Sequence, residues 1–70
     1  MSLVVEIASV PDRDEVVAEI WHNNEMVAEV QRTTSGGFRL EIYPTESGEP
    51  WSFDLEDWLS ALSEAQRRLI

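Results

Sequence analysis

Seventy residues are enough for one domain, and we expect residues 1–70 to form one. A chain this short buries only about 60% of the surface that its unfolded state exposes, so its core alone gives little stability. The absence of cysteine excludes disulfides and thiolate metal sites as supplements, which leaves a partner chain as the supplement that we expect. Because 43% of the residues are hydrophobic, a disordered acidic tail is also excluded.

Fourteen carboxylates face five arginines and no lysine, which gives a net charge of −9. A nucleic acid or an anionic membrane needs a basic surface, so neither is expected as a partner. The charge permits a basic protein partner that is steered electrostatically, and it equally permits a surface that only keeps a small domain soluble.

The first ten residues are apolar, but they lack a basic segment and contain Glu6, so they do not resemble a secretory signal. No apolar run approaches the roughly 20 residues that span a bilayer. We therefore expect a cytoplasmic protein.

Four segments alternate apolar and polar residues in the manner of half-buried strands: 3–10, 15–22, 25–33 and 38–43. Turn chemistry separates them, with Pro-Asp-Arg-Asp at 11–14, two asparagines at 23–24 and Thr-Ser-Gly-Gly at 34–37.

The second and third segments predict a hairpin with a three-residue loop at 23–25. This loop pairs Ile20 with Ala28 and gathers the apolar residues, Met26 among them, on one face. It also places Glu19 opposite Glu29 on the other face, which is mildly destabilising.

A loop at 44–53 leads to a helix at about 54–69. Asp54 is a favoured N-cap whose carboxylate can accept backbone N–H bonds, and Phe53 and Trp58 have the spacing of a hydrophobic staple. An apolar stripe follows at helical spacing: Leu55, Trp58, Leu59, Leu62, Ala65 and Leu69. The fold expected is therefore α+β, an antiparallel four-stranded β-meander with one C-terminal amphipathic helix packed on one face.

One helix covers one face of the sheet, and that inner face should carry Leu3, Val5, Ile7, Ala18, Ile20, Ala28, Val30, Leu40 and Ile42. The outer face then mixes Glu6, Glu19, Glu29, Glu41 and Arg39 with apolar side chains. The apolar set predicts an interface and consists of Val4, Val17, Trp21, Val27 and Tyr43. The alternative is that these are scattered apolar residues without a role.

Signals for chemistry are weak. His22, the one histidine, is expected to be a solvated turn residue rather than a base, and the acidic run Asp12, Asp14 and Glu15 lacks the pattern of a calcium loop. Trp51, Phe53 and Trp58 are interpreted as a staple rather than a recognition pocket. We expect no enzyme, no catalytic residue, no metal and no cofactor.

The leading hypothesis is a small acidic protein-interaction module that forms a homodimer through the apolar outer face. The alternative is an acidic inhibitor or immunity-type protein that covers a basic site on a toxin or nuclease. A β-meander, the segment GEPWSFDL and an acid-led helix are together similar in general style to many small bacterial proteins, and the all-arginine basic set fits a GC-rich coding bias. No motif is specific enough to name a family.

Overall fold

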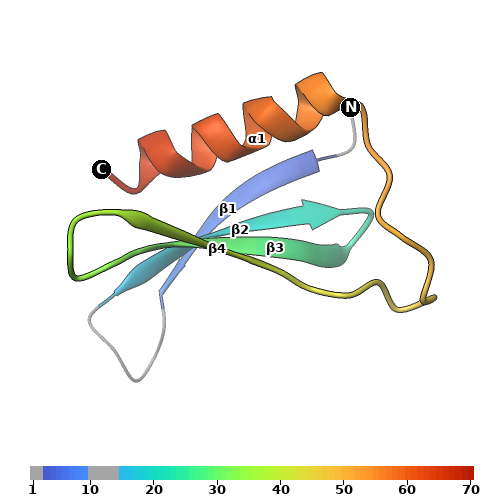
Figure 1. Ribbon diagram of the computed structural model, residues 1–70, viewed down its shortest axis with the longest axis horizontal. Helices are drawn as coiled ribbons and strands as arrows, with labels where there is room; N and C mark the ends of the chain where they lie inside the picture. The colour runs from blue at the N-terminus through green and yellow to red at the C-terminus, as the bar shows by residue number, and fades with distance from the viewer. Residues whose placement is uncertain (1–2, 10–14) are drawn as a thin grey trace.

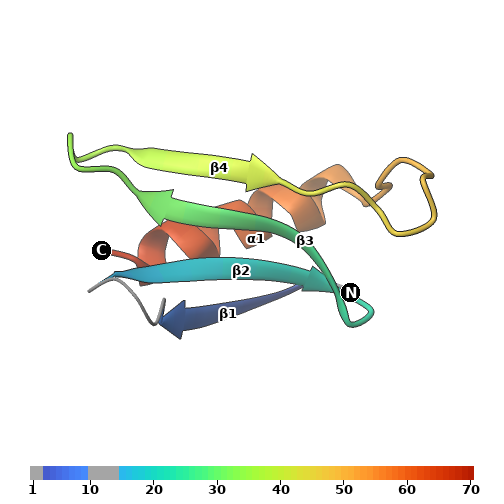
Figure 2. The same cartoon turned by 90° about the horizontal axis from the view of Figure 1, so that it is seen from below.

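The computed structural model describes residues 3–9 and 15–70. It contains five elements: β1 (Leu3–Ser9), β2 (Val16–His22), β3 (Glu25–Arg32), β4 (Phe38–Ile42) and α1 (Leu55–Arg68). The strands form one antiparallel sheet in the order β1-β2-β3-β4, and α1 crosses one face of it (Figure 1). Figure 2 looks onto the opposite, uncovered face. The predicted fold class is confirmed; the predicted turn at 11–14 lies outside the described residues.

The β2–β3 hairpin has the predicted pair of Ile20 with Ala28, and Ala18 pairs with Val30 in the same register, but the predicted three-residue loop is wrong. The turn has two residues, Asn23 and Asn24, with φ of 49° and 66°. Asparagine tolerates this left-handed conformation, so the tight hairpin turn forms.

The extra residue that the predicted loop would have contained lies in a β-bulge within β3 instead. The pairing jumps from Ile20–Ala28 to Trp21–Met26, which leaves Val27 as the extra residue of β3. Met26 therefore shares the outer face with Trp21, whereas Val27 is 1% exposed and belongs to the core. The predicted places of Met26 and Val27 are thus exchanged.

The helix begins after Asp54, but the predicted side-chain cap is absent, because the Asp54 carboxylate accepts no backbone N–H bond. Its main-chain carbonyl instead accepts the bond from the N–H of Trp58 at 3.1 Å. The predicted staple is confirmed: the Phe53 and Trp58 rings stack with centroids 5.9 Å apart.

The face of α1 that packs on the sheet is centred on Ala61 and Ala65, both buried, with Leu69 at its end. Small side chains let the helix lie close to the strands. Leu55 and Leu59, which the stripe predicts as buried, are 69% and 55% exposed because they lie beside this face.

Two arginines fasten the C-terminal end of α1 to the sheet. Arg68 Nη1 donates to the carbonyl of Val5 at 2.9 Å, and Arg32 Nη1 donates to the carbonyl of Leu69 at 3.5 Å. Positive charge at this end of a helix also complements its dipole.

The core lies between α1 and the first three strands. Its buried members are Leu3, Val5, Ala18, Ile20, Val27, Ala28, Val30, Ala61, Ala65 and Leu69. The helix contacts β1, β2 and β3, whereas Leu40 and Ile42 on β4 remain 42% and 58% exposed. Ile7, another predicted inner residue, is 36% exposed.

Candidate functional site

A row of four glutamates crosses the outer face of the sheet, which is the face seen in Figure 2. Glu6 pairs with Glu19, Glu19 with Glu29, and Glu29 with Glu41, so each strand contributes one. Adjacent strands are about 4.8 Å apart, so the row spans roughly 14 Å. We call it the glutamate ladder.

Neighbouring side chains orient three of the four carboxylates of the ladder. Gln31 Nε2 donates to Glu29 Oε1 at 2.8 Å and to Glu41 Oε1 at 2.5 Å. The indole of Trp21 donates to Glu19 Oε1 at 3.1 Å, and the Tyr43 hydroxyl donates to Glu29 Oε1 at 3.4 Å. These donors are neutral, so they orient the carboxylates without cancelling their charge.

No ion pair joins the ladder to an arginine within residues 3–9 and 15–70. Arg32 and Arg68 are held at the end of α1, where Arg68 also pairs with Glu64 at 3.2 Å. Arg39 lies on the outer face, but its cross-strand partner is Gln31. The outer face is therefore strongly negative.

This negative field acts on Tyr43. Burial raises the pKa of the phenol above its ordinary value of 10.0, and the charges of Glu29 and Glu41 raise that pKa further. The hydrogen bond to Glu29 acts in the same direction, because only the neutral phenol can donate it.

The five residues predicted to form an apolar interface do not form one continuous patch. Val4 is 54% exposed, and Trp21 and Tyr43 are half-buried with their polar atoms bonded to the ladder. Val27 lies in the core because of the bulge. Val17 is only 2% exposed. Neither Val17 nor Val27 offers surface to a partner.

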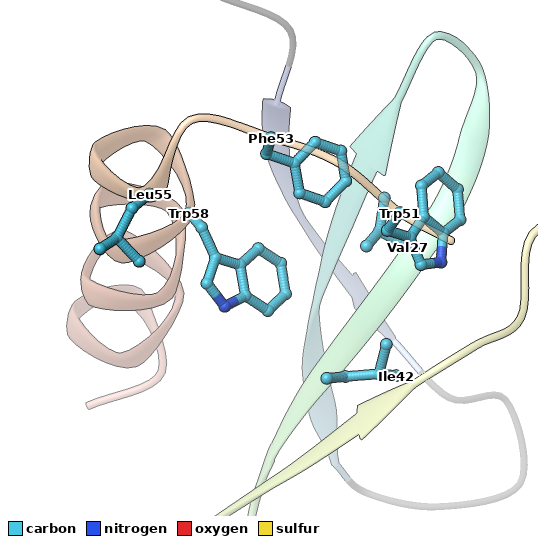
Figure 3. A pocket seen from close by; sticks show the side chains of 6 residues that line it. All are labelled: Val27, Ile42, Trp51, Phe53, Leu55 and Trp58. Atoms are coloured by element: carbon cyan, nitrogen blue, oxygen red, sulfur yellow. The ribbon is translucent and has the colours of Figure 1, made fainter. Parts of the chain in front are cut away.

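On the other face, the border between α1 and β4 is hollow. A cavity of about 300 Å³ opens there, lined by Val27, Ile42, Trp51, Phe53, Leu55 and Trp58 (Figure 3). A second hollow of about 220 Å³ lies further along, between Leu40 on β4 and Leu62 on α1. We call these two hollows the α1–β4 groove; its existence follows from a helix that covers three strands of four.

His22 closes one end of the aromatic cluster beside this groove. Its ring lies edge-on to Phe53 at 5.1 Å and to Trp51 at 6.2 Å, and it is half-buried. The predicted solvated turn histidine is therefore wrong. The residue occupies an inner position of β2, and the approach to the helix folds back over it.

Within the described residues, no group of three or more His, Asp or Glu side chains is arranged to hold a metal ion. Asp12 and Asp14 of the weighed calcium run lie outside those residues. The helix described is too short and too polar to cross a bilayer.

The glutamate ladder was partly predictable, because strand alternation places all four residues outward. The α1–β4 groove was missed, since no sequence pattern states how many strands one helix covers. A comparison with family models, curated proteins and solved structures finds no significant match, so the geometry alone carries the functional interpretation.

Proposed function

We propose that this chain is a small acidic protein-interaction module whose outer sheet face binds a basic surface of another protein. An inhibitor or immunity-type protein that covers a basic site has this design. In this proposal the chain is a cytoplasmic binding protein, not an enzyme, and uses no cofactor. One observation carries it: four carboxylates in cross-strand register, three of them oriented by neutral donors.

The ladder has a cost that a binding role explains. Like charges directly opposite each other destabilise a sheet, and this sheet contains three such pairs in a row. A partner that carries arginine or lysine would relieve this repulsion on binding. On a helix, basic residues one turn apart are about 5.4 Å apart along the axis, close to the strand spacing of about 4.8 Å.

The same face suits a homodimer poorly. Two copies stacked through their outer faces would bring eight ladder carboxylates together. The apolar surface that would oppose this repulsion is reduced to Val4 and parts of Trp21 and Tyr43, because Val17 and Val27 are buried. The ladder therefore favours a basic partner over a second copy at this face.

A peptide titration tests the proposal. The probe is a helical peptide with arginine at every fourth position, compared with the same peptide carrying glutamine there. Calorimetry should detect binding of the arginine peptide alone, weakening steeply with salt. The double variant Glu19→Gln/Glu29→Gln should bind about fivefold more weakly, which is about 1 kcal/mol for two charge pairs at the surface.

The matched control is Glu46→Gln/Glu49→Gln, which removes two charges from the exposed loop before α1. Its affinity should stay near that of the wild type. Equal weakening by both double variants would mean that only net charge matters, and the role of the ladder would be refuted.

A further inference from the structure

Strand β4 is an open edge of the sheet, and two of its three inner side chains are exposed. It is the last strand in the sheet order, and α1 packs on the other three. Leu40 and Ile42 are 42% and 58% exposed on the side of the α1–β4 groove. Exposed edges of this kind are templates for pairing with another strand.

The backbone groups that face this open edge can be identified. Tyr43 N–H donates to the carbonyl of Val27 at 2.8 Å, so the backbone of Tyr43 faces β3. Orientation alternates along an antiparallel strand, so Arg39 and Glu41 also bond to β3. The N–H and C=O groups of the three residues between and before them therefore point outward: Phe38, Leu40 and Ile42.

The sequence of β4, Phe-Arg-Leu-Glu-Ile, reads the same by residue type in both directions, with basic and acidic positions exchanged. Antiparallel pairing about a two-fold axis at Leu40 would place Leu40 against Leu40 of the other copy. Phe38 would face Ile42 of the other copy on the inner side. On the outer side, Arg39 would face Glu41 of the other copy, twice.

The charges of Arg39 and Glu41 favour this register over the two registers that are shifted by one residue. Only residues whose backbone groups point outward can exchange hydrogen bonds across the edge. The two-fold axis can therefore move only by whole residues along β4. Centring on Arg39 would oppose two arginines, and centring on Glu41 would oppose two glutamates. The Leu40 register alone gives two opposite-charge pairs and a row of apolar pairs.

We propose that a second copy of this chain binds β4 in this register and forms a two-fold dimer with one continuous eight-stranded sheet. Such an interface is self-complementary, as two-fold symmetry requires. It uses the edge of the sheet and leaves the ladder residues of β1, β2 and β3 open, so it does not depend on the proposed function.

Charge reversal with mixing tests the register. Sedimentation should give the wild type twice the 8.0 kDa of one chain as its concentration rises. Arg39→Glu alone places glutamates opposite glutamates, and Glu41→Arg alone places arginines opposite arginines, so each variant should stay monomeric. An equimolar mixture of the two should form a heterodimer, because every outer pair is then of opposite charge.

Both side chains are exposed, so both variants should fold, and circular dichroism verifies this. Recovery of the dimer on mixing is a result that a damaged monomer cannot give. A wild type that stays monomeric at every concentration overturns the proposal, as does a mixture that stays monomeric or a single variant that dimerises as well as the wild type. Peptide titration of the ladder has a separate readout, so failure of one proposal leaves the other intact.

Discussion

The indole N–H of Trp51 donates to the main-chain carbonyl of Tyr43 at 2.7 Å, which ties the approach to the helix to the end of β4. The bond is part-buried, so Trp51→Phe should lower the free energy of unfolding by about 0.5–1.5 kcal/mol beyond the lost ring area. Chemical denaturation measures this. The control is Trp58→Phe, since the Trp58 indole donates no hydrogen bond within the described residues; an equal loss in both variants would contradict the role of the bond.

The ladder should be a measurable source of instability. Glu19 stands between Glu6 and Glu29, and Glu19→Gln keeps an acceptor oxygen for Trp21 while it removes the charge. The free energy of unfolding should rise by about 0.2–1 kcal/mol in low salt and by less in high salt, because salt screens the repulsion.

A second glutamine variant gives the opposite sign. Glu56 lies in the first turn of α1, where negative charge complements the helix dipole, so Glu56→Gln should lower the free energy of unfolding by about 0.3–1 kcal/mol. If both variants shifted stability in the same direction, net charge rather than position would be responsible.

Tyr43 should make the protein less stable in alkali. Its folded-state pKa lies above the ordinary value of 10.0, so the folded protein holds the phenol proton more tightly than the unfolded chain does. This contribution is fully present below pH 10 and is lost as the pH rises through the folded-state pKa. Because the chain has one tyrosine, tyrosinate absorbance follows this group alone. Tyr43→Phe should flatten this part of the stability profile, and an unchanged profile would contradict the assignment.

Proline should distinguish the two edges of β4. The N–H of Glu41 faces β3, so Glu41→Pro should lower the free energy of unfolding by about 1–3 kcal/mol through the lost backbone hydrogen bond between β3 and β4. The N–H of Leu40 faces the open edge, so Leu40→Pro should lower the free energy of unfolding by clearly less. Both variants are compared at a protein concentration low enough to keep the chain monomeric. The same Leu40→Pro change should abolish self-association; a larger loss for Leu40→Pro would reverse the assignment of the edges.

The alanines of α1 should be intolerant of size. Ala65 is fully buried where the helix meets the sheet, so Ala65→Leu should lower the free energy of unfolding by about 1–3 kcal/mol through overpacking. Leu59→Ala removes a side chain that is 55% exposed and should have a much smaller effect. Thermal melting of the two variants tests the ranking.

Most of the fold followed from local patterns, because strand alternation and the helical stripe are properties of neighbouring residues. The errors arose where two local preferences competed. The asparagines at 23 and 24 favoured a two-residue turn, the apolar pairing favoured an odd loop, and the bulge at Val27 satisfied both. A reading of alternation alone could not place Val27 in the core.

The site was less predictable than the fold. The outward glutamates followed from alternation, but their alignment across all four strands depends on three registers at once. The predicted stripe on α1 correctly included Ala65, but it also included the exposed Leu55 and Leu59 and omitted Ala61, which is buried. The uncovered edge at β4 follows from the position of α1, which packs on β1, β2 and β3.

The order of the elements also affects how the molecule is made. Each strand pairs with its neighbour in sequence, which keeps contacts local and favours rapid folding. The helix follows all four strands in the sequence. At usual rates of translation the inner face of the sheet therefore stays exposed for about 1–5 s, until the helix has been synthesised. During that interval nascent chains are vulnerable to aggregation, and the carboxylates aligned across the strands repel one another between chains. The negative charge of the glutamate ladder on the outer face would then protect the unfinished protein from aggregation before the ladder binds any partner.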